Sequence, residues 1–491
     1  MVAARRLAGT EISLLLLGSP EELKGDAARA WNDLLKAPGE VHIHIVREAA
    51  ELEQHKELLD CDLLIDAVLG TGFQPPMRGL ALAAMEWLRK SSAPVLSVDL
   101  PSGWSADSTA ATTSAFPSDA VVTFTAPKPA HLFGQLTRRW NQPVLAVPIG
   151  SPEAAIEASL TADRQNLYWA CSALELAQRP RPAASNKGNF GHVLVVGGCM
   201  GSAGGKVGAP AMAALASLRS GAGLVTAAVP APALAVVASF APELMTWPLE
   251  ATSEGSIAIP TEEAPLQKLT AGKSVLAIGP GLGQHPASKT FVQKLLATTR
   301  APAVLDADAL NLLSSDPAWM EMLSDQARNG RTIVLTPHPG EMARLSGLST
   351  TEVQADRPGT ASAFAQKTGF IVVLKGARTL IAHPDGSIAI NTSGNPGMAK
   401  GGSGDVLTGL IAGLLAQHPQ DPYHAVEAAV CLHGLSADFA VGRLHERTLM
   451  ATDLLQDLSR AFSFRCVGPG RYVWLQGQPP QSFAAIHEAV E

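Results

Sequence analysis

The sequence predicts an α/β protein built on mainly parallel sheets. Short apolar runs alternate with helical patterns along most of the chain, which is typical of βαβ units with helices on both faces of a sheet. The length of 491 residues allows about three domains of roughly 150 residues, or two large ones. A Pro-rich segment at 179–186 interrupts the alternation and indicates a linker or entry loop between two halves.

The first half, residues 1–152, is expected to form one domain. Helical patterns cover 23–35 and 80–90. Apolar runs predict strands at 12–17, 41–46, 62–69, 95–100, 120–125 and 144–149. Because helices separate several of these runs, the strands should pair in parallel.

The second half, residues 165–463, predicts a larger domain that ends in helices. A turn at His383-Pro-Asp-Gly indicates a hairpin between 379–382 and 387–391. Residues 464–491 have weak periodicity and are predicted to form a tail. The other strands are expected from 192 onward and at 224–229, 275–279, 303–306, 332–335 and 370–374, and the last helices at 403–417, 422–441 and 454–462.

Composition excludes several classes of protein. Hydrophobic residues make up 46% and charged residues 16%, which argues against wholesale disorder. Lys and Arg number 37 against 44 Asp and Glu, a net charge of -7, so the basic surplus of a nucleic-acid-binding protein is missing. Apolar stretches are too short to span a membrane, and no signal peptide is evident. The five scattered cysteines indicate reduced thiols in a cytoplasmic protein.

The strongest site candidate is the segment 394–405, GNPGMAKGGSGD, which leads into the helix that begins at 403. Its glycines let backbone amides approach a phosphate, and Lys400 can neutralise phosphate charge. One interpretation of Asp405, at the helix start, is that it is merely a helix cap. Because it closes a run of glycines with a lysine, we interpret it as a base that deprotonates or orients a substrate hydroxyl beside the phosphate.

Other polar residues follow strands in both halves, where ligands of α/β sheets bind. In the second half these are 279–283 (GPGLG), Asp306 and Asp308, 336–341 (TPHPGE), and 374–379 (LKGART). In the first half, Asp66 and the 70–73 loop follow one strand, and Asp99 and Ser102 follow the next. Each could be turn or capping chemistry alone, but together they suit converging acid/base or cation sites.

The second half resembles the ADP-dependent NAD(P)H-hydrate dehydratase family. The resemblance covers roughly 165–462 and rests on 187–192 (KGNFGH), 195–198 (VVGG), 218–225 (LRSGAGLV), 279–283, 336–341, 395–398 and 402–405. It implies a ribokinase-like fold and repair of damaged NADH and NADPH. The (S)-hydrates, NADHX and NADPHX, would be dehydrated at the expense of ADP, with Mg²⁺, giving NAD(P)H, AMP and phosphate.

The resemblance also implies roles for individual residues. Asp405 would be the catalytic base. Facing the hydrate would be Gly281, His338, Pro339, Gly340, Glu341, Met342, Ala343 and Arg344. Holding the adenine nucleotide would be Lys375, Gly376, Ala377, Arg378, Thr379, Asn395, Pro396, Gly397, Met398, Ala399, Lys400, Gly401, Gly402, Ser403 and Gly404.

The first half is similar to the Rossmann-like NAD(P)H-hydrate epimerase domain, on 62–73, 97–103 and 125–131. The resemblance implies that Asp66 and Ser102 bind K⁺ and that Asp99 is the acid/base residue. Contacts to the hydrate would come from Gly70, Thr71, Gly72, Phe73, Gln74, Pro75 and Pro76. The family's Asn-Asn-Gly-Gly-Asp-Gly loop would fall just before Met1, so we expect a truncated domain with weak or no epimerase activity.

Alternative functions remain open from the sequence alone. The glycine-rich loop and Asp405 would also suit a ribokinase-like kinase of a small molecule such as a vitamin precursor. The first half could instead be a binding or oligomerisation module. The resemblance further implies a homo-oligomer, while the charge balance and the short apolar stretches predict no nucleic-acid or membrane partner.

Overall fold

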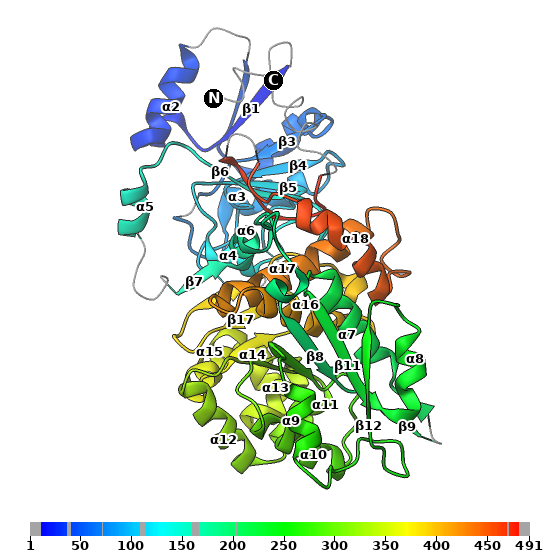
Figure 1. The fold of residues 1–491 in the computed structure, drawn as a ribbon. Helices are drawn as coiled ribbons and strands as arrows, with labels where there is room; N and C mark the ends of the chain where they lie inside the picture. The colour runs from blue at the N-terminus through cyan, green and yellow to red at the C-terminus, as the bar shows by residue number, and fades with distance from the viewer. Residues whose placement is uncertain are drawn as a thin grey trace. The chain divides into compact units, whose positions relative to one another are not determined.

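The computed structural model describes residues 11–36, 41–70, 72–108, 114–159, 166–201, 204–468 and 471–480. The chain divides into two compact units. The first contains Met1–Gly150 and Pro469–Gly477, and the second contains Ser151–Gly468 and Gln478–Glu491. Figure 1 shows strands and helices alternating through both. The predicted α/β class is confirmed.

The first unit is built around a sheet in the order β19-β6-β5-β4-β3. Strands β3 (Leu64–Asp66), β4 (Val95–Val98), β5 (Ala120–Phe124) and β6 (Val144–Val147) pair in parallel. Strands β3 and β4 are shorter than predicted, because the chain turns at Asp66 and at Asp99 to form the loops of the candidate site.

Strands β1 (Ile12–Leu17) and β2 (Val41–Val46) have the predicted bounds but pair in parallel only with each other. Helix α2 (Gly25–Leu35) lies between them in the chain, and α3 (Gly79–Leu88) follows β3. Apolar side chains of α3 pack with Val46, Leu52 and Val95 in a buried core. This core joins the two sheets of the first unit.

Part of the predicted tail is a strand. Strand β19 (Val473–Gln476) pairs antiparallel with β6 and completes one edge of the first unit's sheet. Trp474 and Leu475 are buried. The sequence did not reveal this strand because only four residues contribute, and they pair with a strand more than 300 residues earlier in the chain.

The second unit has a sheet in the order β12-β11-β8-β13-β14-β15-β16-β17-β18-β7. Its central parallel strands are buried on both faces, which explains their continuous apolar sequences. The predicted hairpin is confirmed as antiparallel β17 (Leu380–Ala382) and β18 (Ile388–Ile390). The remaining strands are β7 (Leu167–Trp169), β8 (His192–Val196), β11 (Leu224–Pro230), β12 (Met245–Leu249), β13 (Val275–Ile278), β14 (Ala303–Leu305), β15 (Ile333–Leu335) and β16 (Ile371–Leu374).

Helix α16 (Ser403–Gln417) carries the strongest candidate segment at its start. It packs against α7 (Gly208–Arg219), α17 (Pro422–Ala440) and strands β8, β13 and β14. Its residues from Val406 to Ala416 are all buried, so the helix is fixed on every side. Other helices of this unit are α10 (Pro286–Ala297), α11 (Asp308–Ser314), α12 (Pro317–Arg328), α13 (Pro339–Ser346), α15 (Arg357–Thr368) and α18 (Ala451–Ser463).

Strand register brings the predicted polar segments to one edge of this sheet. Ile278 pairs with Leu305, Leu305 with Leu335, and Leu335 with Val372. These strands are parallel, so 279–283, 306–308, 336–341 and 375–379 all emerge at their carboxyl ends.

Candidate active sites

Asp405 lies in the first turn of α16, half-buried at the carboxyl edge of the sheet. The helix can start here because Gly402 adopts a φ of 95°, which side chains rarely tolerate. Gly404 has no side chain, and a Cβ there would lie 3.5 Å from Lys375 Nζ and 3.7 Å from Asp306 Oδ2. The start of the helix therefore closely approaches two charged groups.

Asp306 is the centre of a buried polar cluster. Its Oδ1 accepts hydrogen bonds from Lys375 Nζ at 2.8 Å and from the Thr336 hydroxyl at 2.7 Å. Its Oδ2 accepts one from the Thr408 hydroxyl at 2.8 Å. Only 1% of the residue is exposed. The cluster joins three strand ends to α16, one turn beyond Asp405.

The environment of Asp405 shifts the pKa of its carboxyl group toward neutral pH. Burial raises its pKa to about 7, and the nearby carboxylates of Asp306 and Asp308 add to the increase. The ammonium groups of Lys375 and Lys206 offset part of it. A carboxylate with a pKa near the working pH is an effective general base.

Lys375 lies between the acidic groups of two strand ends. Besides its bond to Asp306, its Nζ lies 3.8 Å from Glu341 Oε2. Burial alone lowers the pKa of Lys375, but the carboxylates of Asp306 and Glu341 outweigh burial and raise it. Lys375 therefore remains charged and presents a fixed cation beside the glycine loop.

The segment predicted to face the hydrate forms the start of α13. His338 is the N-cap, and its Nδ1 accepts the amides of Gly340 at 3.0 Å and Glu341 at 3.3 Å. Glu341 in return accepts the amide of His338 at 2.8 Å. Met342 and Ala343 are buried in the core, while Arg344 donates to Asn311. In this conformation Met342 and Ala343 support the segment rather than line an open site.

Gly281 lies where only glycine fits. Its φ is 64°, and a Cβ would come within 2.3 Å of the Lys206 carbonyl oxygen. Asp308 stabilises the same region, because its carboxylate accepts the Gly283 amide at 2.8 Å and pairs with Lys206 at 3.2 Å. The glycine loop after β13 is thus held close to the acidic strand end after β14.

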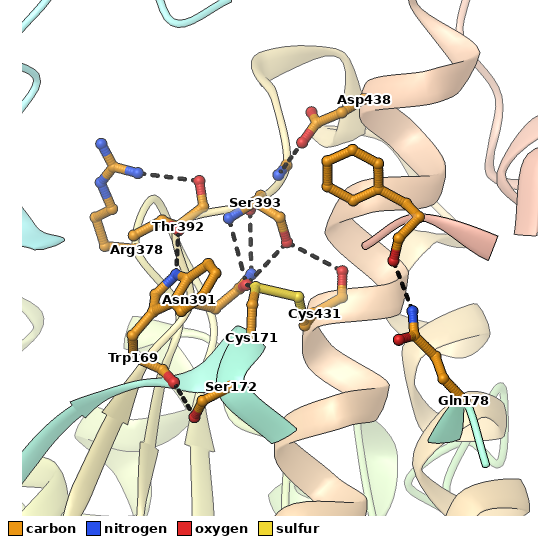
Figure 2. The surroundings of a disulfide bond; sticks show 12 residues. Trp169, Cys171, Ser172, Gln178, Arg378, Asn391, Thr392, Ser393, Cys431 and Asp438 are labelled. Atoms are coloured by element: carbon orange, nitrogen blue, oxygen red, sulfur yellow. Dashed lines mark hydrogen bonds between the residues drawn. A yellow bond between two sulfur atoms is a disulfide. The ribbon is translucent and has the colours of Figure 1, made fainter. Parts of the chain in front are cut away.

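The glycine-rich segment is anchored where it begins (Figure 2). Asp438, buried within α17, accepts the Gly394 amide at 2.8 Å and the Asn395 side-chain amide at 2.9 Å. Burial raises the pKa of Asp438 to about 7 despite these hydrogen bonds. The side-chain oxygen Oδ1 of Asn395 accepts the Gly397 amide at 3.1 Å. The start of the loop is therefore fixed on a helix behind it.

The rest of the predicted nucleotide segment is also held by the protein. Lys400 Nζ donates to the Arg447 carbonyl at 2.6 Å, and Ser403 Oγ lies 3.4 Å from Nε2 of the buried His433. Arg378 donates to the Thr392 carbonyl at 3.0 Å and has a φ of 58°. Lys400 thus contacts the backbone in this structure and would have to reorient to reach a phosphate.

A disulfide corrects one prediction. Cys171 and Cys431 are bonded across a sequence separation of 260 residues, so they are not the reduced thiols that the scattered pattern indicated (Figure 2). Cys431 is on α17, and Cys171 follows β7. Close by, the Trp169 indole donates to the Thr392 hydroxyl at 2.8 Å, and Ser393 Oγ lies 3.0 Å from the Cys431 carbonyl. The crosslink therefore stands beside the chain that enters the glycine loop.

In the first unit, Asp66 and Ser102 form a buried pair. The Ser102 hydroxyl donates to Asp66 Oδ1 at 2.5 Å, and the Ser102 amide donates to Oδ2 at 2.8 Å. The Leu69 amide donates to Ser102 Oγ at 2.8 Å, which brings the start of the 70–76 loop to the pair. Burial raises the pKa of Asp66, and within the described residues no basic side chain forms an ion pair with it.

Asp99 lies one strand away with strained backbone, at a φ of 69°. Its carboxylate accepts the Thr123 hydroxyl at 2.7 Å and forms an ion pair with Lys128. His131 Nε2 lies 2.7 Å from the Asp99 carbonyl oxygen. Residues 70 and 72–76 of the predicted contact loop follow β3, whereas Thr71 is outside the described residues.

Several residues of these clusters were missed by sequence reasoning. Asp438 is, like Glu427, an acidic residue within the otherwise largely apolar run 425–440 of α17, and this was the available signal. Lys128 lies inside a segment that sequence reasoning had selected, but its ion pair with Asp99 is visible only in three dimensions. Thr408 was missed because it has no feature that distinguishes it from other helix residues, although it donates to Asp306. Lys206 was missed as well; it follows a glycine-rich turn and pairs with Asp308.

Comparison with known proteins gives the family of the chain. The sequence model of NAD(P)H-hydrate dehydratases matches residues 193–460, and that of the YjeF-related protein N-terminus matches residues 1–130. The bifunctional NAD(P)H-hydrate repair enzyme Nnr of Moorella thermoacetica is 39% identical over 93% of this chain and 84% of that protein. The chain belongs to the bifunctional NAD(P)H-hydrate repair enzyme family. The Escherichia coli Nnr enzyme is 35% identical over 92% of this chain and 80% of that protein.

For this NAD(P)H-hydrate repair enzyme, the N-terminal family match covers the domain that the sequence led us to expect as truncated. The N-terminal family match begins at residue 1 and extends over the first unit to residue 130. The enzyme therefore has both an epimerase and a dehydratase domain.

Solved structures give the fold of the second unit of this NAD(P)H-hydrate repair enzyme. A ribokinase-like superfamily protein from Enterococcus faecalis matches 61% of this chain and 96% of its own, with a TM-score of 0.50 and 29% identity. The Bacillus subtilis ADP/ATP-dependent NAD(P)H-hydrate dehydratase, co-crystallised with ATP/Mg²⁺, matches 59% of this chain and 96% of its own, with a TM-score of 0.48 and 32% identity. The predicted ribokinase-like fold is confirmed.

Within the described ranges, no helix combines the length and apolarity needed to cross a membrane. Nor do the described side chains include a group of three or more His, Cys, Asp or Glu able to hold a metal ion.

Proposed function

We propose that the second unit dehydrates (S)-NADHX and (S)-NADPHX with ADP as co-substrate, and that the first unit interconverts the (R)- and (S)-hydrates. The observation that carries the first proposal is Asp405, a carboxylate with a pKa of about 7 at the start of a glycine-bounded helix. An ordinary N-cap carboxylate would have a lowered pKa, since it accepts backbone amides.

The glycine-rich segment and the helix start would hold the ADP phosphates. Exposed amides at the beginning of α16 favour negative charge, and no side chain blocks their approach at 401, 402 and 404. Lys375 adds a fixed positive charge 3.5 Å from the position of a Cβ on Gly404. Segments 375–379 and 395–404 are thus proposed to contact the nucleotide.

Asp405 would take the proton of the hydroxyl on the hydrated nicotinamide ring. The hydroxyl oxygen then attacks the β-phosphorus of ADP, and the bond from that phosphorus to the bridging oxygen breaks to release AMP. Phosphate is a much better leaving group than hydroxide. Its departure, with loss of one ring proton, restores the dihydropyridine of NAD(P)H. Gly281 and the start of α13 would position the hydrate.

Mg²⁺ would enter this site with the nucleotide. Because the described side chains form no metal-binding group of their own, phosphate oxygens would supply most of its ligands. When bound, the ion would stabilise the charge of the transferring phosphoryl group.

In the first unit, Asp66 and Ser102 are proposed to hold K⁺. The pair fits a cation, because the Asp66 carboxylate is buried, has oxygen neighbours and lacks a cationic partner among the described residues. Asp99 would exchange the proton needed for epimerisation, with Lys128 fixing its orientation. Residues 70–76 would contact the hydrate.

A direct assay tests the proposal. The protein would be incubated with ADP, Mg²⁺ and a mixture of NADHX epimers, and the return of NADH absorbance would be followed with AMP and phosphate. We expect complete conversion, since epimerisation supplies the (S)-hydrate. Conversion that stops when the (S)-hydrate is exhausted would contradict the epimerase part. A stable phosphorylated alcohol formed from ATP, with no NADH, would favour the kinase alternative.

The homo-oligomer, the lack of nucleic-acid and membrane partners, and the cytoplasmic location stay predictions.

A further inference from the structure

We propose that Asp306 is a positioning residue of the dehydratase reaction, which holds Lys375 against the start of α16 and keeps Asp405 basic enough to accept a proton near neutral pH. The inference rests on the proposed role of Asp405. It assigns a task to a buried carboxylate that does not need to touch either substrate.

The geometry around Asp306 fixes the carboxylate in one orientation. Hydroxyl donors at 2.7 Å and 2.8 Å, from Thr336 and Thr408, engage its two oxygens separately. Its third partner is Lys375 Nζ at 2.8 Å. A buried carboxylate with this many donors cannot rotate without losing a hydrogen bond, which is costly away from water. Asp306 is therefore a rigid support for the lysine ammonium.

Thr408 transmits this arrangement to the catalytic turn. It lies three residues after Asp405 on α16, so the two side chains share one face of the helix. The Thr408–Asp306 hydrogen bond fixes that face against the end of β14.

The charges that surround Asp405 come from several elements. Asp306 and Asp308 follow β14, Lys375 follows β16, and Lys206 precedes α7. Glu341 and His338 at the start of α13 also face Lys375, as does His433 of α17. Of the charged neighbours, Asp306 is the one that contributes most to raising the pKa of Asp405, while Lys375 contributes most to lowering it. The two groups act in opposite directions on one base.

The test is the pH dependence of kcat/KM for (S)-NADHX. This value should increase with pH as Asp405 loses its proton. Asp306→Asn keeps the shape of the side chain and removes its charge. We expect the midpoint of this rise to move to lower pH by about one unit, and the plateau rate to fall about tenfold because the base is weaker. Thr408→Val keeps the charge and removes one hydrogen bond, so it should lower the rate without moving the midpoint.

Lys375→Gln gives a complementary test that does not depend on the folding of Asp306→Asn. Loss of the ammonium should move the midpoint to higher pH. Opposite displacements in the two variants would support the proposal. An unmoved midpoint in a folded Asp306→Asn protein, or in Lys375→Gln, would overturn it.

Failure of this inference differs from failure of the proposed function. If the wild type dehydrates the hydrate, Asp405→Asn is inactive and the midpoint does not move in Asp306→Asn, only the role of Asp306 is wrong. If Asp405→Asn turns over normally, the proposed role of Asp405 is wrong as well.

Discussion

Asp438 accepts the backbone amide of Gly394 at 2.8 Å from within a buried helix, and so fixes the point where the glycine-rich loop begins. Its other oxygen accepts the side-chain amide of Asn395 at 2.9 Å. Two donors of the loop therefore depend on one carboxylate that is only 3% exposed.

Replacement of Asp438 should weaken nucleotide binding. Asp438→Ala leaves the Gly394 amide and the Asn395 amide without their acceptor, and we expect the KM for ADP to rise about tenfold or more. Steady-state kinetics with varied ADP would measure it. Asp421→Ala is the matched control, because Asp421 is the N-cap of the same helix, is only partly buried, and contacts His424 rather than the loop. Equal KM values in the two variants would contradict the anchoring role.

Asp99 should be required for epimerisation alone. Asp99→Asn removes the proton acceptor but can keep a hydrogen bond from Thr123, so the unit should remain folded. We expect interconversion of the (R)- and (S)-hydrates to slow at least about a hundredfold, with dehydration of pure (S)-hydrate unchanged. Chromatographic separation of the epimers over time would measure the rate. Loss of both activities would point to a general defect instead.

Asp66 should govern a response to K⁺. Asp66→Asn removes the negative charge. We therefore expect the epimerase rate of this variant to be the same in K⁺ buffer and in tetramethylammonium buffer. Asp62→Asn is the control, since Asp62 is exposed and precedes the same strand. A wild-type rate that is equal in both buffers would refute the proposed K⁺ site.

The disulfide should stabilise the second unit. Because it closes a loop of 260 residues, its removal is expected to cost roughly 2–5 kcal/mol of the free energy of unfolding. A thiol reductant, which supplies two electrons and two protons, should lower the Tm of the wild type but not of Cys171→Ser. Cys61→Ser, at an exposed free cysteine, should behave like the wild type. An unchanged Tm on reduction, with both free thiols detected, would contradict this.

The predictable parts of the molecule are those encoded locally. Helix α16 has the predicted bounds because its glycine start and apolar run are adjacent in sequence. The strand ends were found because parallel strands share one carboxyl edge, and this placed Asp306 and Lys375 correctly. Their ion pair could not be foreseen, since 69 residues separate them. The same holds for the Cys171–Cys431 bond and for the pairing of β19 with β6, because these partners are separated by even more residues.

The raised pKa of Asp405 could not be predicted from the sequence either. An Asp before a helix predicts a cap with a low pKa, and only the burial of Asp405 beside Asp306 reverses the direction. The sequence pattern indicated the residue, and the packing of α16 supplied its chemistry.

The central claim is that Asp405 is the base of the dehydratase reaction. The most direct test is Asp405→Asn, measured by NADH formation from pure (S)-NADHX and by ADP binding in isothermal titration calorimetry. We predict that dehydration falls at least about a hundredfold while ADP affinity is kept, and that wild-type kcat/KM increases as pH rises through about 7. An Asp405→Asn protein that forms NADH at the wild-type rate would contradict the account.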